Sequence, residues 1–306
     1  MRGDRMVACA LFALALATYF ATSSSHLAGG DSAEFVTIFA KGGVAHPSGY
    51  PLYCLLLRLC AWMPGGPILG ASRVTAIVGA FSVAALYRAC RAWGSSRGAA
   101  AVAAAAYGVS PLAWRLATEA EVFALNALLA ALLLWAAAPR LSMPPATRVV
   151  SLAGLAGLAL SNHLTIVLLG PIGLFAAFHA LRASAFRART ALSSAAAFGA
   201  GLLPYLYCYE VGRAPNGRYV WGEPGTWEGL VRHVSRADFG TFSLTGSDQS
   251  PDWLSNVWVY PPVSGKLSPP PGSGVRADFL QGARTGNSCE LHERLQGEVG
   301  AASVVA

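Results

Sequence analysis

The chain has 306 residues, of which 54% are hydrophobic and only 12% are charged, and its mean hydropathy is +0.47. A soluble domain carries about a quarter charged residues, so this composition excludes an ordinary soluble protein. Charged residues are scarcest between Met6 and Tyr209, which indicates several membrane spans. The net charge of +7 comes from basic residues spread along the chain without interleaved aromatics, so nucleic acid is not a predicted partner.

The N-terminus allows two interpretations. Arg2 and Arg5 precede the apolar run Met6–Thr22, as they would in a secretory signal peptide. That run is longer than a usual signal core, and Ser23–His26 offers only a weak cleavage site. We therefore expect a retained first span.

Seven apolar segments approach the length of about 20 helical residues that crosses the hydrocarbon core. They are Met6–Thr22, Ala71–Cys90, Gly98–Leu112, Glu121–Ala138, Val149–Leu160, His163–Leu181 and Ala191–Tyr209, of which the third and fifth are short. The sequence thus predicts an all-α bundle of about seven transmembrane helices in residues 1–209. The mixed, Pro- and Gly-containing part of the first loop, residues 23–66, is predicted to form interfacial or re-entrant helices.

Arginines divide the ends of these spans into two sets. If seven spans alternate, ten arginines fall on one face: Arg2, Arg5, Arg88, Arg91, Arg97, Arg140, Arg148, Arg182, Arg187 and Arg189. Basic residues favour the cytosolic side, so the N-terminus is predicted to be cytosolic. The first loop and everything after Glu210 then lie on the opposite side.

The composition changes beyond the last predicted span. Residues 210–244 contain a turn that leads into a short amphipathic helix, Trp227–Val234. Residues 245–306 are dominated by Ser, Pro, Gly and Asp and show no core-forming pattern. This tail is predicted to be poorly ordered.

Asp31 and Glu34 follow the first span at a spacing that places both on one face of a helix. One carboxylate can take a proton from an acceptor hydroxyl while the other orients a group or a cation. The same spacing is typical of a capping box at a helix N-terminus. The sequence leaves both interpretations open.

His46 lies in the rigid turn His46–Pro51 and can hydrogen-bond a phosphate or a sugar hydroxyl there. An exposed histidine in a structural turn is the commoner explanation. Arg115 either pairs with nearby acids or binds the phosphate of an anionic lipid substrate. Glu121 precedes an apolar helix, where the helix dipole is a sufficient structural reason for an acidic residue.

Asn162 and His163 separate two apolar runs at a turn on the non-cytosolic side, and a polar turn is their simplest explanation. The sequence contains no Walker loop, dinucleotide fingerprint, HExxH motif or nucleophile elbow. Two carboxylates are too few to predict a metal site, so no metal is predicted and a need for a divalent cation stays open. A transporter is disfavoured because no internal repeat is evident.

Several motifs, in order along the chain, resemble one family. They are Gly30–Glu34, Val44–Tyr53, Ala120–Asn126, Gly157–His163, Leu203–Tyr207, Trp221–Pro224 and Arg232–Val234. They resemble the transmembrane protein O-mannosyltransferases, which are multi-span glycosyltransferases of the GT-C type that use lipid-phosphate-linked sugars and mannosylate plexin-type receptor ectodomains. The resemblance covers roughly residues 30–242 and ends near Phe242, where family members continue with further spans. A truncated product and a faulty gene model are the two explanations that this departure leaves open.

The resemblance implies a multi-pass protein of the endoplasmic reticulum membrane with a luminal site and a luminal C-terminus. It implies dolichyl-phosphate-mannose as donor, Ser or Thr hydroxyls of secretory or receptor proteins as acceptors, and no required cofactor. The acidic residue of the first luminal loop acts as base in such enzymes, which here is Asp31 with Glu34 in support. The donor-binding set is His46, Arg115, Glu121, Asn162 and His163. The alternatives are a non-catalytic membrane scaffold, a transporter, or a related enzyme with another lipid-linked sugar.

Overall fold

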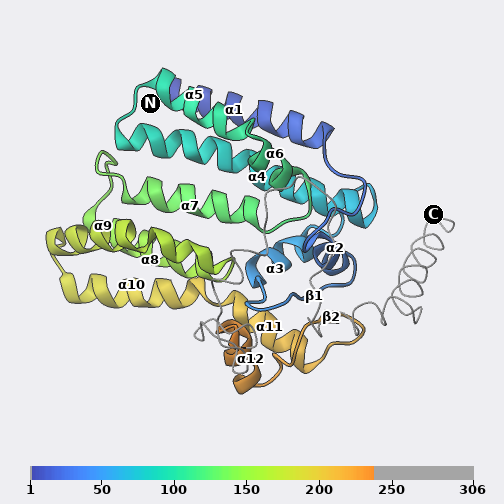
Figure 1. Cartoon of the computed structure of the whole chain (residues 1–306). Helices are drawn as coiled ribbons and strands as arrows, with labels where there is room; N and C mark the ends of the chain where they lie inside the picture. Colours follow the sequence, from blue (N-terminus) through green and yellow to red (C-terminus); the bar gives the residue numbers. More distant parts are fainter. Residues whose placement is uncertain (1, 238–306) are drawn as a thin grey trace, which may run out of the picture. The chain divides into compact units, whose positions relative to one another are not determined.

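The computed structural model describes residues 2–237, and nearly all of their secondary structure is helical (Figure 1). The longer segments are α1 (Arg2–Ala21), α4 (Gly66–Trp93), α5 (Arg97–Gly108), α7 (Phe123–Ala137), α8 (Pro145–Leu160), η1 (Leu164–Leu169) with α9 (Gly170–Ala183), and α10 (Arg187–Gly201). The shorter ones are α2 (Ser32–Lys41), β1 (Gly43–Val44), α3 (Pro51–Leu59), α6 (Pro111–Thr118), α11 (Pro204–Arg213), β2 (Tyr219–Val220) and α12 (Trp227–Val234). The predicted tail, residues 245–306, lies outside the described residues.

Four helical stretches among residues 2–237 are long and apolar enough to cross a membrane, which makes the chain a helical membrane protein. They are Arg2–Ala21, Gly66–Trp93, Leu164–Ala183 and Arg187–Arg213. A fifth is added if α6 and α7, which meet at a bend of 117°, are counted together. The remaining predicted spans form α5 and α8, but these have only 12 and 16 residues. The all-α prediction is confirmed, whereas the count of seven spans is not.

The long helices lie side by side, and the short elements α2, α3, α11 and α12 gather at one end of them (Figure 1). The N-terminus and the connections α4–α5, α7–α8 and α9–α10 lie at the other end, where most of the predicted set of arginines is found. Several of these arginines donate to carbonyls at helix ends, as Arg140 does to Gly94 O and Arg187 to Arg182 O. Arginines near helix C-termini satisfy carbonyls that lack an intrahelical partner.

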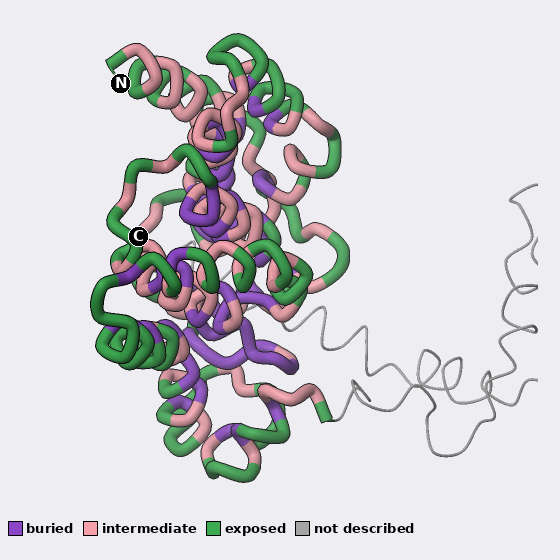
Figure 2. Tube along the Cα trace, turned by 90° about the vertical axis from the view of Figure 1, so that its left-hand side faces the viewer, coloured by how far each residue is buried: buried purple, intermediate pink, exposed green. Residues whose placement is uncertain are grey.

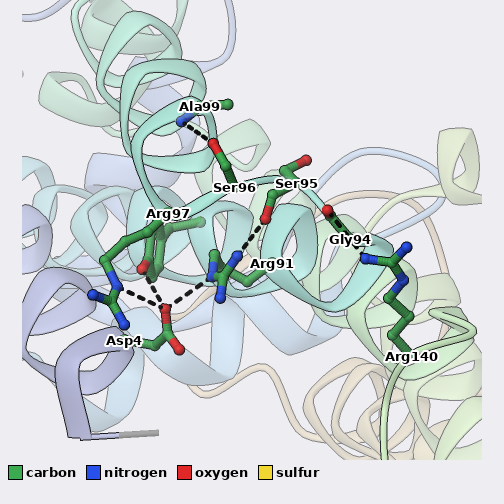
Figure 3. Close-up of polar contacts among 9 residues, drawn as sticks. Asp4, Arg91, Gly94, Ser95, Ser96, Arg97, Ala99 and Arg140 are labelled. Atoms are coloured by element: carbon green, nitrogen blue, oxygen red, sulfur yellow. Dashed lines mark hydrogen bonds and ion pairs between the residues drawn. The ribbon is translucent and has the colours of Figure 1, made fainter.

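Helix α1 is bound to its neighbours at both ends. Asp4 accepts hydrogen bonds from Arg91 at 2.8 Å and Arg97 at 3.4 Å (Figure 3). Towards the opposite end, the buried hydroxyl of Tyr19 donates to Gly108 O at 2.7 Å. Trp114 of α6 donates to the Thr22 hydroxyl at 3.1 Å. These contacts make α1 an integral helix of the described bundle.

The buried positions run through the middle of the described part, and its outer turns are exposed (Figure 2). The largest buried cluster joins α2 and α3 to the long helices α4 and α7. Phe35 and Ile38 of α2 and Tyr53 of α3 are fully buried in it, and Val74 of α4 is nearly so. The helices of the first loop form where they were predicted, and their apolar faces pack against the bundle.

A short parallel pairing connects the first loop to the segment after α11. Gly43 pairs with Tyr219 and Val44 with Val220. A Cβ atom on Gly43 would lie 2.0 Å from Tyr219 O, so only glycine permits this approach. The pairing places α12, which has the bounds predicted for the amphipathic helix, beside the turn that contains His46.

Helices α8 and α10 approach each other through glycines. A Cβ atom on Gly157 would lie 2.2 Å from Phe198 O, whereas one on Gly199 would meet no atom within 4 Å. We predict that Gly157→Ala lowers the thermal unfolding midpoint in detergent, because forcing the helices apart costs about 1–3 kcal/mol. The matched change Gly199→Ala should raise the midpoint or leave it unchanged, since alanine is the better helix former. Equal midpoints for the two variants would contradict this packing.

Candidate active site

The contact between Glu34 and His46 links α2 to the turn after β1. Glu34 Oε1 accepts the backbone N–H of His46 at 2.9 Å, and Oε2 lies 2.6 Å from Nδ1 of the same ring. Both side chains are largely buried, with 11% and 16% of their surface exposed. A carboxylate that binds both the backbone and the ring of one residue fixes the position and the orientation of the imidazole.

The second ring nitrogen of His46 faces the other side of the site. Nε2 lies 2.9 Å from the Tyr50 hydroxyl and 3.8 Å from Asp31 Oδ2. The hydrogen bond to Glu34 raises the pKa of His46, against the effect of burial, and Asp31 acts in the same direction as Glu34. The structure therefore brings Asp31, Glu34 and His46 together, as the sequence-based hypothesis requires.

The structure forms neither half of the capping box. Asp31 occupies the N-cap position of α2, but its side chain makes no capping hydrogen bond. Glu34 binds His46 instead of turning back towards the N-cap. The Asp31 carboxylate, with 45% of its side chain exposed, is thus left for another role.

His163 forms the far wall of the site. Its ring stacks on Tyr50, with centroids 5.5 Å apart and an interplanar angle of 15°. Nδ1 accepts the backbone N–H of Thr165 at 3.2 Å, so the proton of the neutral ring resides on Nε2. Burial lowers the pKa of His163, and the positive charge of Arg236 adds to this effect. A neutral imidazole that donates from Nε2 suits a hydrogen bond to an oxygen of a substrate.

Glu121 lies in the short break between α6 and α7, outside both helices, and only 5% of it is exposed. Burial raises its pKa to about 7, and the nearby Asp31 carboxylate adds to the shift. Asn162 is fully buried beside this break and donates to Val122 O at 3.5 Å. Both side chains therefore border the site from behind Asp31 and His163.

Arg115 lies apart from the other predicted residues. Its guanidinium is 3.4 Å from Glu119 one turn further on, and 65% of the side chain is exposed. Its positive charge acts to lower the pKa of Glu121, against the larger effect of burial. Of the two interpretations of Arg115, the structure shows the pairing with an acidic neighbour, Glu119. A role of Arg115 in phosphate binding stays a prediction.

The structure adds residues to which the sequence interpretation gave no role. Tyr50 has a left-handed backbone, with φ of 43°, which directs its ring between His46 and His163. Trp221, half-exposed, meets His46 edge-on with ring centroids 6.1 Å apart. Arg236 follows α12, and its side chain hydrogen-bonds Tyr50. The first two lie in motifs already noted, whereas no sequence signal marks Arg236.

This arrangement is suited to proton abstraction beside a positively charged side chain. An exposed carboxylate, Asp31, stands beside a rigidly held histidine, and a neutral histidine and an arginine line the opposite side. Among residues 2–237, no three His, Cys, Asp or Glu side chains are grouped so that they would hold a metal ion.

Fold and site together define a polytopic helical membrane protein with an acid–histidine cluster at one end of its helices. The family model described as the "Protein O-mannosyl-transferase TMEM260 N-terminal domain" matches residues 31–185. This match covers just over half of the chain, and the chain belongs to that family. The family resemblance inferred from the motifs is confirmed.

Two curated relatives extend the comparison. The mouse "Protein O-mannosyl-transferase TMEM260" is 35% identical over 250 residues, which are 78% of this chain and 35% of the relative. The protein of the same name from Dictyostelium discoideum is 25% identical over 256 residues, 78% of this chain and 31% of its own length. The chain thus spans about a third of the length of these relatives. No solved structure matches it.

We predict that the contribution of Glu34 to stability depends on pH. Because the folded-state pKa of His46 is raised above 6.5, the ion pair stabilises the protein fully below that pH and loses its effect as the pH rises through the raised pKa. Glu34→Gln keeps an acceptor for the backbone N–H but loses the charge. It should cost about 2 kcal/mol near pH 5.5 and clearly less near pH 9, measured as thermal midpoints in detergent.

The matched control is Glu228→Gln, which removes an acidic residue from the first turn of α12. Its effect should be small at both pH values. If Glu34→Gln lowers the thermal midpoint equally at both pH values, the charge on His46 does not contribute to the stabilisation by Glu34.

Proposed function

We propose that this chain is the membrane part of a protein O-mannosyltransferase, which transfers mannose from dolichyl-phosphate-mannose to Ser or Thr hydroxyls. The names of the mouse and Dictyostelium relatives support the class of reaction. The observation that carries the proposal is the Asp31 carboxylate. It starts α2 without capping it, is exposed, and lies 3.8 Å from a histidine held by Glu34.

In the proposed reaction, Asp31 takes the proton of the acceptor hydroxyl as the oxygen attacks the anomeric carbon of mannose. The bond between that carbon and the phosphate oxygen breaks, and dolichyl phosphate leaves with the electron pair. The configuration at the anomeric carbon inverts. A phosphate is a stable leaving group, so the site has to supply orientation and charge stabilisation more than an acid.

The cationic side of the site is the proposed location of the donor phosphate. His163 presents an Nε2–H there, and Arg236 brings a permanent positive charge beside Tyr50 and His163. A guanidinium binds phosphate oxygens with charge-assisted hydrogen bonds. Asn162 and Glu121 are buried behind this surface, so they support it from below.

The proposed location is the membrane of the endoplasmic reticulum, with the site in the lumen. The end of the bundle that bears most of the arginine set lies opposite α2 and α3. An arginine-rich end favours the cytosol, so the Asp31 end would face the lumen. That is where acceptor domains of secretory and receptor proteins are exposed.

We predict that Asp31→Asn abolishes transfer while the protein remains inserted and folded. The amide cannot accept the proton, and loss of a general base costs about 10²–10⁴-fold in rate. The full chain would be expressed in microsomes with radiolabelled dolichyl-phosphate-mannose and a Ser/Thr-rich receptor ectodomain. Glu228→Gln serves as the control that should retain the wild-type rate.

The possible results separate the hypotheses. If the wild type labels the ectodomain and Asp31→Asn does not, the result supports dolichyl-phosphate-mannose as the donor and Asp31 as the base. Full activity of Asp31→Asn would exclude Asp31 as the base. No label from correctly inserted wild type would favour a non-catalytic scaffold, and label from another lipid-linked sugar would change the donor.

We also predict that Arg236→Ala raises the KM for the lipid donor about tenfold, since a charged hydrogen bond contributes about 1.5–3 kcal/mol. Arg213→Ala is the control, because that arginine is exposed and pairs with Glu210 on the surface. The measurement is the initial transfer rate against donor concentration. An unchanged KM for Arg236→Ala would place the phosphate elsewhere, for instance near Arg115.

A further inference from the structure

The backbone at the start of α2 lies against the carboxyl group of Glu121. Gly30 adopts φ of +70°, and a Cβ atom there would lie 3.5 Å from Glu121 Oε1. The backbone N–H of Asp31 interacts with the same carboxyl. Because Asp31 does not cap its own helix, Glu121 supplies from outside the helix a contact that holds this turn.

Glu121 itself has little freedom to move. Its neighbours Ala120 and Val122 are fully or almost fully buried, and Val122 O accepts a hydrogen bond from the buried amide of Asn162. The preceding helix is fastened to the same loop as Asp31, since Ser24 N–H donates to Thr118 O at 2.8 Å. Glu121 is therefore a fixed wall behind Asp31.

The surroundings of Glu121 favour its neutral form. Its Oε2 is buried and has no hydrogen-bond partner among the described residues. Burial, the Asp31 carboxylate and Glu119 raise the pKa of Glu121, whereas Arg115 and the backbone N–H of Asp31 lower it by less. Tyr53 of α3 also lies within electrostatic reach. A neutral carboxyl still accepts from the Asp31 backbone, and it does not place a second negative charge behind that carboxylate.

We propose that Glu121 is a positioning residue that holds the Gly30–Asp31 turn and so places the Asp31 carboxylate beside His46. This inference rests on the proposed function for its catalytic consequence, and it replaces the donor-binding role predicted for Glu121. The placement matters because the Asp31 carboxylate makes no capping bond of its own and is half-exposed. A shift of about 1 Å in a reacting group can cost on the order of 100-fold in rate.

The test compares Glu121→Gln, Glu121→Ala and the control Glu228→Gln, a change in the first turn of α12, in the microsomal transfer assay across a range of pH. Glu121→Gln keeps the acceptor and the shape, so its kcat should stay near that of the wild type. Glu121→Ala should lose kcat by on the order of 100-fold with little change in the donor KM. Deprotonation of Glu121 should reduce the wild-type rate at alkaline pH, and Glu121→Gln should lack that decline.

A second measurement does not depend on activity. Amide hydrogen exchange at the first turn of α2, followed by mass spectrometry in detergent, should accelerate in Glu121→Ala and not in Glu121→Gln or Glu228→Gln. If the wild type transfers no mannose, the proposed function fails, and the exchange data alone decide whether Glu121 holds the turn. Unchanged exchange in Glu121→Ala, or equal kcat in Glu121→Ala and the wild type, would overturn the inference.

Discussion

Glu34 binds both the backbone N–H and the ring of His46, and the remaining geometry of the site depends on this contact. It fixes the turn after β1 to α2, although the two are separated by the sharp reversal at Gly42 and Gly43. With the ring fixed, Nε2 has a defined position against which Asp31 and Tyr50 are arranged. A charge-assisted hydrogen bond between two largely buried groups is strong enough for this purpose.

The three carboxyl groups of the site, those of Asp31, Glu34 and Glu121, differ in their environments. Glu34 pairs with the His46 ring that it orients. Glu121 is buried, its Oε2 has no hydrogen-bond partner, and it forms no ion pair among the described residues. Asp31 is the one that reaches the surface of the site beside His46. Because burial and partners differ, the same chemical group is assigned three roles in the proposed reaction: Glu34 fixes His46, Glu121 positions the Asp31 turn, and Asp31 is the base.

The described bundle has two chemically different ends. At the end near the N-terminus, arginines bind Asp4 and the last carbonyls of the helices. At the other end, aromatic and ionisable side chains surround Asp31. The proposed reaction needs such an asymmetry, because a lipid-linked donor would present its polar group at one membrane surface only.

The sequence determined the properties that depend on local pattern. Apolar length located α1 and α4, amphipathic periodicity located α12 with its observed bounds, and the order of motifs indicated the family. The length test was less reliable for α5 and α8, because a helix packed inside a bundle can be shorter than a full span. The prediction that Asp31, Glu34 and His46 belong to one site also came from the sequence.

Only the tertiary structure decided which partner each of these side chains contacts. The spacing of Asp31 and Glu34 fits a capping box equally well, and the presence of His46 twelve residues after Glu34 settled the choice. Arg236 follows α12, far in sequence from Tyr50 beside which it lies, and no local sequence pattern predicts this contact. The exposed pairing of Arg115 likewise depends on where α6 ends. Local patterns constrain backbone conformation and burial, whereas the partner of a charged group is set by contacts between segments distant in sequence.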